Sequence, residues 1–217
     1  MKHLTYAFIG LAMICCSIKL YAQAPEDKIK AITPMHEFLK ANMDSTIILQ
    51  FNSNWIHSPE YFILSKKGDT LTAFKYQTLP AYDNRIVMPK SVASKLRKNR
   101  ITQIFSTPVD INQYFNPQFI DPDSIKKLWN NLLSLHPWQM KDDAKDGLGC
   151  PLEKGKDPIQ IYDGGGITLF LITKDDIKKL SFYAPEFYEK ECPGRKGRQD
   201  ILKIEQYFLT HFQPVKL

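Results

Sequence analysis

The chain contains 217 residues, of which 29 are Lys or Arg and 23 are Asp or Glu, so its formal net charge is +6. This length corresponds to one ordinary domain and is sufficient to bury a hydrophobic core. The excess of positive charge is too small to indicate a nucleic-acid-binding protein by itself, and we expect no nucleic-acid partner.

The first residues of the chain have the pattern of an export signal. A positive start at Lys2 and an apolar run over Leu4–Ile18 precede the small residues Ala22 and Ala24. A run of about fifteen apolar residues is short for a bilayer core of roughly 30 Å, which favours a cleaved signal over a membrane anchor. We expect cleavage after Ala22, because cleavage after Ala24 would leave the ring of Pro25 beside the scissile bond.

Cleavage at this point divides the chain into a signal peptide, 1–22, and a single domain, 23–217, exported to the periplasm or the cell exterior. No second long apolar run follows, so we expect no transmembrane segment after cleavage. The pair Cys15-Cys16 leaves lipidation open as an alternative. Lipidated exports carry small residues immediately before the cysteine, whereas Met13-Ile14 stands there in this chain.

Only Cys150 and Cys192 remain after cleavage. Two cysteines in an exported domain most simply form one disulfide, which would enclose the strands predicted between them. The same pairing argues against Cys150 as a nucleophile, because a thiolate must be reduced to react. The His-Gly context of cell-wall transpeptidases and the Cys-Trp context of papain-like hydrolases are also absent from the sequence.

The first half of the domain is predicted to contain one short helix and a β-rich block. Thr33-Pro34 is typical of a helix N-cap followed by proline at the first helical position. Turn residues at Lys67–Asp69 separate two of the runs that have strand character. The expected strands are Thr46–Phe51, Tyr61–Ser65 and Leu71–Tyr76, and a polar connection before the second of them holds Trp55 and His57.

The middle of the chain is less regular. Pro89 begins a predicted basic helix over Lys90–Lys98, and Ile101–Phe105 is predicted to add a strand. A long loop with prolines and aromatic residues then leads to Asp121, the N-cap of the strongest predicted helix, which ends before Pro137. The apolar face of this helix comprises Ile125, Leu128, Trp129, Leu132 and Leu133.

The charged segment 141–157 predicts an exposed loop, with Asp142-Asp143 as solvated turn residues. The last block is predicted to contain the strands Ile159–Tyr162, Ile167–Thr173 and Ile177–Tyr183 and a closing helix over Gln199–Phe212. Because Ile63–Lys66 resembles Leu171–Lys174, two copies of a three-stranded meander could form a pseudo-repeat; alternatively, hairpins with polar turns simply look alike. We therefore predict an α+β fold, with antiparallel β-meanders packed against two or three amphipathic helices.

No motif predicts a cofactor or a metal site. Gly164–Gly166 is followed by the β-branched and apolar run 167–173, which predicts a hairpin turn rather than a phosphate-binding loop. No two histidines are four residues apart and no C-x-x-C occurs, so no zinc ligand set is predicted. A glycosidase needs two carboxylates that converge in the fold, and the sequence leaves that possibility open.

One polar cluster predicts a binding site, because Arg195, Lys196 and Arg198 lie among glycines immediately before the closing helix. Exposed N–H groups and the helix dipole favour an anion at such a place, and arginine side chains bind phosphate, sulfate or carboxylate groups. The alternative is a solvated loop whose charges aid solubility.

The second half of the chain combines the aromatic run Ser181–Tyr188, the turn Cys192–Gly194, the segment Tyr162–Gly166 and Trp138. In this combination, residues 125–212 resemble small secreted proteins of Bacteroidota-type bacteria, a group with no established activity. The resemblance implies export and no particular chemistry.

These observations favour an exported, non-enzymatic module that binds an anionic envelope ligand or another envelope protein. The reason is that no nucleophile, base or metal-ligand set converges in the sequence. The alternative is a periplasmic hydrolase acting on a cell-wall or glycan substrate, which a cleft with two carboxylates would favour. A purely structural role in the envelope is a third hypothesis.

Overall fold

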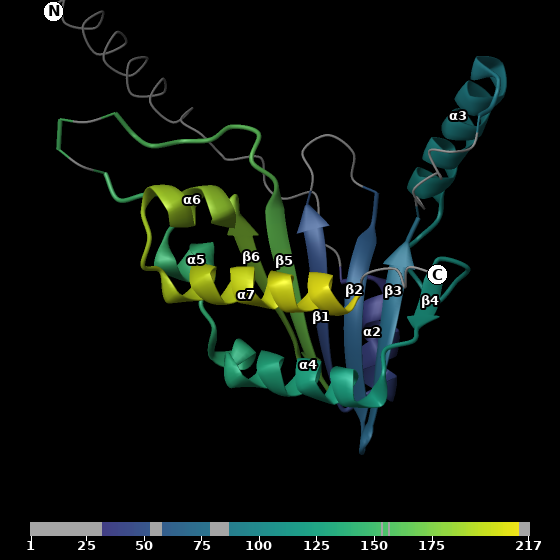
Figure 1. Cartoon of the computed structure of the whole chain (residues 1–217), viewed down its shortest axis with the longest axis horizontal. Helices are drawn as coiled ribbons and strands as arrows, with labels where there is room; N and C mark the ends of the chain where they lie inside the picture. Colours follow the sequence, from purple (N-terminus) through teal and green to yellow (C-terminus); the bar gives the residue numbers. More distant parts are fainter. Residues whose placement is uncertain (1–31, 53–57, 79–86, 153, 156, 213–217) are drawn as a thin grey trace, which may run out of the picture. The chain divides into compact units, whose positions relative to one another are not determined.

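In the described part of the chain, six strands form one antiparallel sheet in the order β4-β3-β2-β1-β5-β6 (Figure 1). The computed structural model describes residues 32–52, 58–78, 87–152, 154–155 and 157–212. The strands are β1 (Ser45–Asn52), β2 (Glu60–Lys67), β3 (Thr70–Gln77), β4 (Phe115–Gln118), β5 (Gly166–Thr173) and β6 (Ile177–Tyr183). The helices are α2 (Pro34–Asn42), α3 (Lys90–Ser106), α4 (Pro122–Ser134), α5 (Asp143–Asp146), α6 (Pro185–Glu191) and α7 (Lys196–His211), with a 3-10 turn at Pro137–Gln139. The predicted α+β fold is confirmed.

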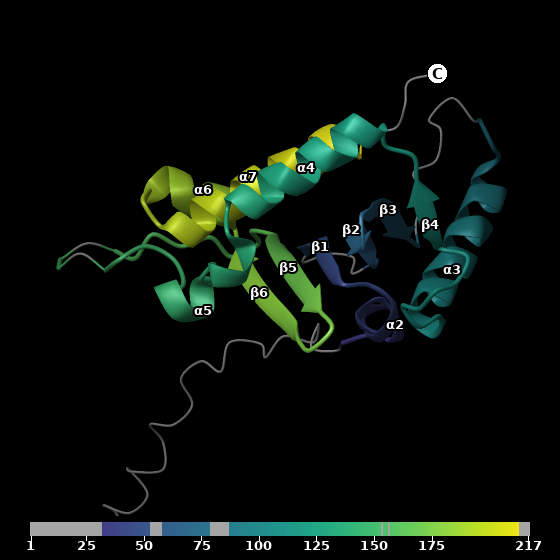
Figure 2. The ribbon, with the colours of Figure 1, turned by 90° about the horizontal axis from the view of Figure 1, so that it is seen from below.

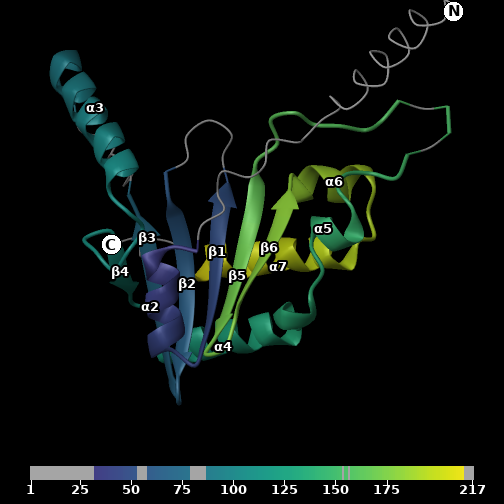
Figure 3. The same cartoon turned by 180° about the vertical axis from the view of Figure 1, so that it is seen from behind.

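Helices cover both faces of the sheet, α4 and α7 on one face and α2 on the other (Figures 2 and 3). In the central strand β1, Ile47 and Leu49 pack in the core beneath α4 and α7, whereas Ile48 packs in the core beneath α2. Both faces of β1 are therefore buried, which explains why Ile47, Ile48 and Leu49 are apolar in succession rather than alternating with polar residues.

Helix α2 is joined to its face of the sheet by a buried histidine. The amide of Thr33 donates a hydrogen bond to Nδ1 of His36 at 3.2 Å, and the hydroxyl of Thr33 lies 2.7 Å from the same nitrogen. The ring of His36 packs against Tyr61 and Phe170, with centroid distances of 5.7 and 4.3 Å. The predicted N-cap at Thr33 is confirmed, and burial lowers the pKa of His36 to about 4.

Helix α4 begins at the predicted position, because the Asp121 carboxylate accepts the amide proton of Ser124 at 3.0 Å. Ile125, Leu128, Trp129 and Leu132 are buried as predicted. Leu133, which was predicted to share their face, is exposed. It follows Leu132 by 100° around the helix axis and so falls at the rim of the buried stripe.

The β6 edge of the sheet is closed by side chains. The amide of Ser181 donates to the carboxylate of Asp142 at 3.1 Å, and the amide of Tyr183 donates to the carboxylate of Asp143 at 2.7 Å. The ammonium group of Lys178 donates to the carbonyl oxygens that precede α5. The interpretation of Asp142-Asp143 as solvated turn residues is therefore wrong, because both carboxylates are hydrogen-bonded to the edge strand.

Two predicted strands are absent from the structure. The segment 101–105 is the last part of α3, where it continues the helix because no turn residue separates it from Lys90–Lys98. The segment 159–162 is an extended connection. It cannot pair with β5, the strand that follows it in the chain, because β5 is already hydrogen-bonded to β1 on one side and β6 on the other. The second meander thus has two strands rather than three, and α6 was not predicted.

Several sequence-based predictions concern residues outside the described part of the chain. The signal peptide 1–22, Trp55 and His57 are among them. Within the described residues, no helix combines the length and the apolar character that crossing a membrane requires.

Candidate functional site

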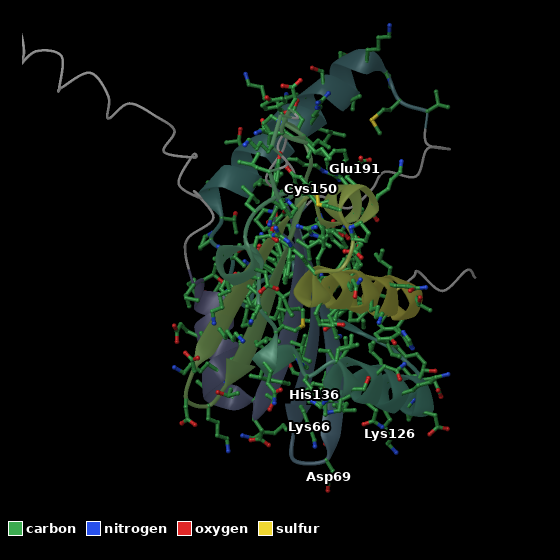
Figure 4. The ribbon with its side chains drawn as sticks, turned by 90° about the vertical axis from the view of Figure 1, so that its left-hand side faces the viewer. Lys66, Asp69, Lys126, His136, Cys150 and Glu191 are labelled. Carbon is green, nitrogen blue, oxygen red and sulfur yellow. A yellow bond between two sulfur atoms is a disulfide. The ribbon has the colours of Figure 1, made fainter. Side chains whose placement is uncertain are left out.

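Three segments meet beside the start of α7: the connection after α5, the end of α6 and the N-terminal turn of α7. The predicted disulfide joins two of them, since Cys150 and Cys192 are bonded with their Cα atoms 5.6 Å apart. Figure 4 places Cys150 near Glu191, the last residue of α6. The bridge ties the connection after α5 to the end of α6 and encloses two strands rather than the three that were predicted.

Arg198 lies at the centre of this corner and is only 2% exposed. Its guanidinium donates to the carbonyl oxygen of Gly149 at 3.4 Å, lies 3.8 Å from the sulfur of Cys192 and stacks over the ring of Tyr188 at 5.3 Å. Burial lowers the pKa of Arg198, although a guanidinium remains charged in proteins. Arg198 therefore holds the connection after α5, the disulfide and α6 together.

Arg195 is the N-cap of α7 and is half-buried. Its guanidinium packs against Gly147, where a Cβ atom would lie 3.4 Å from Nη1 and where φ is +90°, a value that suits glycine. Asp143 is close enough for its charge to interact with both Arg195 and Arg198. Burial raises the pKa of Asp143, while the hydrogen bond from the Tyr183 amide and the two arginine charges act in the opposite direction.

The structure separates Lys196 from the two arginines. Helix α7 begins three residues before the predicted start at Gln199, so Lys196 and Arg198 lie in its first turn rather than in a loop before it. Lys196 is exposed and forms an ion pair with Asp200 along the helix. Within the described residues, Nη1 of Arg195 and Nε of Arg198 are buried without a hydrogen-bond partner. Anion binding by Arg195, Lys196 and Arg198 stays a prediction, and the geometry assigns Arg198 a structural role.

The connection between α5 and β5 exposes large apolar side chains that the sequence analysis did not identify. Four large apolar side chains are exposed on the connection between α5 and β5, which we call the apolar loop: Leu148, Leu152, Ile159 and Tyr162. Leu152 and Tyr162 are the most exposed, at 79% and 84%. In Figure 1 the apolar loop is the green segment that extends beyond α6. The exposure of Leu148 and Leu152 could have been predicted, because both occur in the charged, glycine-containing segment 141–157 that was expected to be an exposed loop.

Both ends of the apolar loop are fixed to the body of the fold. The disulfide at Cys150 holds its first part. At the other end, the hydroxyl of Tyr183 lies 2.9 Å from the carbonyl oxygens of Ile161 and Tyr162, and Gly164 packs closely against Ala184. The exposed side chains are thus carried on a base that is bonded to β6 and α6.

A groove lies between α6 and α7. It has a volume of about 510 Å³, and its lining residues are Glu186, Glu189, Lys190, Leu202, Glu205, Gln206, Leu209 and Thr210. Burial and the neighbouring charge of Glu186 raise the pKa of Glu205. The groove therefore gathers the kind of carboxylates that the hydrolase alternative requires.

A second groove, of about 350 Å³, lies between β3, the residues after β4 and the start of α4. Its lining includes Phe119, whose side chain is 85% exposed. Within the described residues, no three His, Cys, Asp or Glu side chains gather as metal ligands would.

Comparison with known proteins gives no further assignment. No protein-family model matches the chain, and no curated protein matches it. The functional argument therefore depends on the geometry of the three surfaces described above.

Proposed function

We propose that this protein is an exported, non-enzymatic binding module that docks onto another envelope protein through the apolar loop. The observation that carries the proposal is that one connection, fixed at its two ends by the disulfide and by Tyr183, exposes four large apolar side chains, those of Leu148, Leu152, Ile159 and Tyr162. Covering such side chains with a partner would gain a free energy of about 25 cal/mol for each Å² of apolar surface removed from water. Large apolar side chains left exposed on one segment indicate a site of association.

The fixed base favours binding for an energetic reason. A loop that is already anchored loses less conformational entropy when a partner covers it, so more of the contact energy appears as affinity. Leucine and tyrosine side chains provide large contact areas, and aromatic residues are enriched at the centres of protein interfaces. These properties favour a protein partner with a complementary apolar surface.

Two features support an exported location. The sequence of 1–22 has the pattern of a cleaved signal, and the Cys150–Cys192 bridge suits an oxidising compartment.

Site-specific photo-crosslinking in the envelope of the native host tests the proposal. A photoreactive residue at Leu152 or Tyr162 should give one discrete crosslinked protein. The matched control is Phe119, an equally exposed apolar residue on another surface. Equal crosslinking at all three positions would indicate random contact, and a product of twice the mass of this chain would indicate self-association; either result would refute docking onto a different protein.

A hydrolase acting on a cell-wall glycan is the second candidate, and the groove between α6 and α7 is the observation that favours it. A carboxyl group of raised pKa beside a second carboxylate is the arrangement of a general acid and its partner in glycoside hydrolysis. Glu205 would be the acid and Glu186 the base or nucleophile. Release of reducing ends from purified peptidoglycan, lost in Glu205→Gln and retained in Glu191→Gln, would support this function over the binding module.

A further inference from the structure

Almost all of the net positive charge of the chain is concentrated in α3. This helix of 17 residues carries five basic side chains and neither Asp nor Glu. The formal net charge of the whole chain is +6, so every other residue together contributes +1. The basic residues of α3 are Lys90, Lys95, Arg97, Lys98 and Arg100.

Helix α3 is exposed along most of its length. It connects β3 to β4 and so lies at the sheet edge opposite β6 and the apolar loop (Figures 1 and 2). Among its described side chains only Ile104, near the end of the helix, is buried, whereas the apolar side chains of Val92 and Leu96 remain exposed. The packing that normally stabilises a surface helix is therefore limited to its last turns.

The charges within α3 are also unfavourably arranged for an isolated helix. Lys95 precedes Lys98 by three residues, so this pair brings like charges to adjacent turns. The first turn contains no acidic residue to interact with the positive end of the helix dipole, and the N-cap residue, Pro89, has no side-chain acceptor for the first amides. An external anion would stabilise this distribution of charge.

We propose that α3 binds a linear anionic polysaccharide. Successive residues of a helix are 100° apart, so the basic side chains are spread around the axis. Viewed down this axis, the exposed apolar residues Val92 and Leu96 fall at angles between those of Lys95 and Arg100. A helix that lies in a bilayer surface instead separates its cations from one broad apolar face. A flexible polyanion can contact cations on several sides of a helix about 25 Å long, which a flat membrane cannot.

The choice of a polysaccharide over a nucleic acid rests on the proposed export, because an exported protein meets glycans rather than nucleic acids. The positive charge of α3 itself does not depend on export. Anion binding by α3 and the preference for a polysaccharide are therefore tested separately, with a sulfated glycan and a DNA of equal charge as probes.

The test uses purified chain 23–217 with heparin as the probe. The variant Lys95→Ser/Arg97→Ser/Lys98→Ser removes three charges from α3, and Lys126→Ser/Lys127→Ser/Lys203→Ser removes three exposed charges from α4 and α7. The α3 variant should bind heparin at least about tenfold more weakly at 50 mM salt. The slope of log K against log salt should fall by about 2 units, because three contacts between cations and sulfate groups are lost and fewer counterions are released. The control should change affinity less than about threefold.

Hydrogen exchange of the unsubstituted protein keeps the proposal testable if the α3 variant folds poorly. Heparin should slow exchange within Lys90–Ser106, and far-ultraviolet circular dichroism should show a gain of helix. Equal losses in the two triple variants, or protection elsewhere in the chain, would overturn the assignment to α3. Tighter binding to DNA of equal charge, or to vesicles with anionic lipid, would overturn the assignment of a polysaccharide as the ligand.

Photo-crosslinking through the apolar loop should be unchanged in the α3 variant. A negative result in the crosslinking experiment would therefore refute the docking proposal without bearing on the role of α3.

Discussion

Acid should destabilise this protein through His36, because burial lowers its pKa from 6.5 to about 4. The amide of Thr33 can only donate, so Nδ1 of His36 must accept and the neutral ring carries its proton on Nε2. Protonation of Nδ1 would remove this acceptor and place a charge against the rings of Tyr61 and Phe170. Burial raises the pKa of Tyr61 to about 12, so Tyr61 stays neutral and provides no countercharge.

The magnitude follows from proton linkage. The folded-state pKa of His36 lies below the unfolded value, so the unfolded chain binds more protons as the pH falls from 6.5 to about 4, and stability decreases over that interval. At pH 5 the loss relative to pH 7.5 is about 2 kcal/mol, and it approaches about 3 kcal/mol below pH 4. The variant His36→Gln does not titrate, and glutamine is a usual partner of the N-cap amide at this helix position.

Urea unfolding at several pH values measures this effect. The free energy of unfolding of the unsubstituted chain, minus that of His36→Gln, should fall by about 2 kcal/mol between pH 7.5 and pH 5. The subtraction cancels the carboxylates that titrate in both proteins. His136→Gln, at an exposed histidine, controls for the substitution itself. A difference that stays constant across this pH range would refute the buried, neutral histidine.

Three further predictions concern the disulfide, the start of α7 and export. Replacing Cys150 and Cys192 with Ser should lower the free energy of unfolding by at most about 4 kcal/mol, the chain-entropy value for their separation of 42 residues; an unchanged urea midpoint would contradict this. Gly197→Ala should destabilise the protein by about 2 kcal/mol in thermal unfolding, although alanine favours helices. The reason is that the Cβ atom of alanine at position 197 would lie 2.0 Å from the main-chain oxygen of Lys141. Intact mass of protein from the native host should show a chain that begins at Gln23, and a lipidated Cys15 or Cys16 would exclude a soluble product.

The elements that the sequence predicted correctly are those set by local signals. The N-cap at Thr33, the apolar runs that became β1 and β2, and the Asp121 cap of α4 depend on residues within a few positions of one another. Cysteine pairing was predictable for a different reason, since only one pair was available after cleavage.

Apart from the segment 101–105, which continues α3, the failures concern partners that lie far apart in the chain. A strand at 159–162 was excluded by β1 and β6, which occupy both sides of β5. Local composition could not show that Asp142 and Asp143 accept amides about forty residues away on β6. Local composition likewise could not show that Arg198 binds the carbonyl oxygen of Gly149 and lies over Tyr188, which leaves Lys196 as the exposed member of the three predicted anion-binding residues. Anion binding by the three stays a prediction.

The carboxylates on β6 have a consequence for how the sheet terminates. An edge strand with free amides is a template on which a second chain can add a strand, by domain swapping or as the start of a fibril. Asp142 and Asp143 occupy two of those amides, at Ser181 and Tyr183, with acceptors that present no donors in return. The two carboxylates thus accept the amide protons that a further strand at this edge would otherwise bind. Because a carboxylate has no N–H group, it does not itself provide a new strand edge.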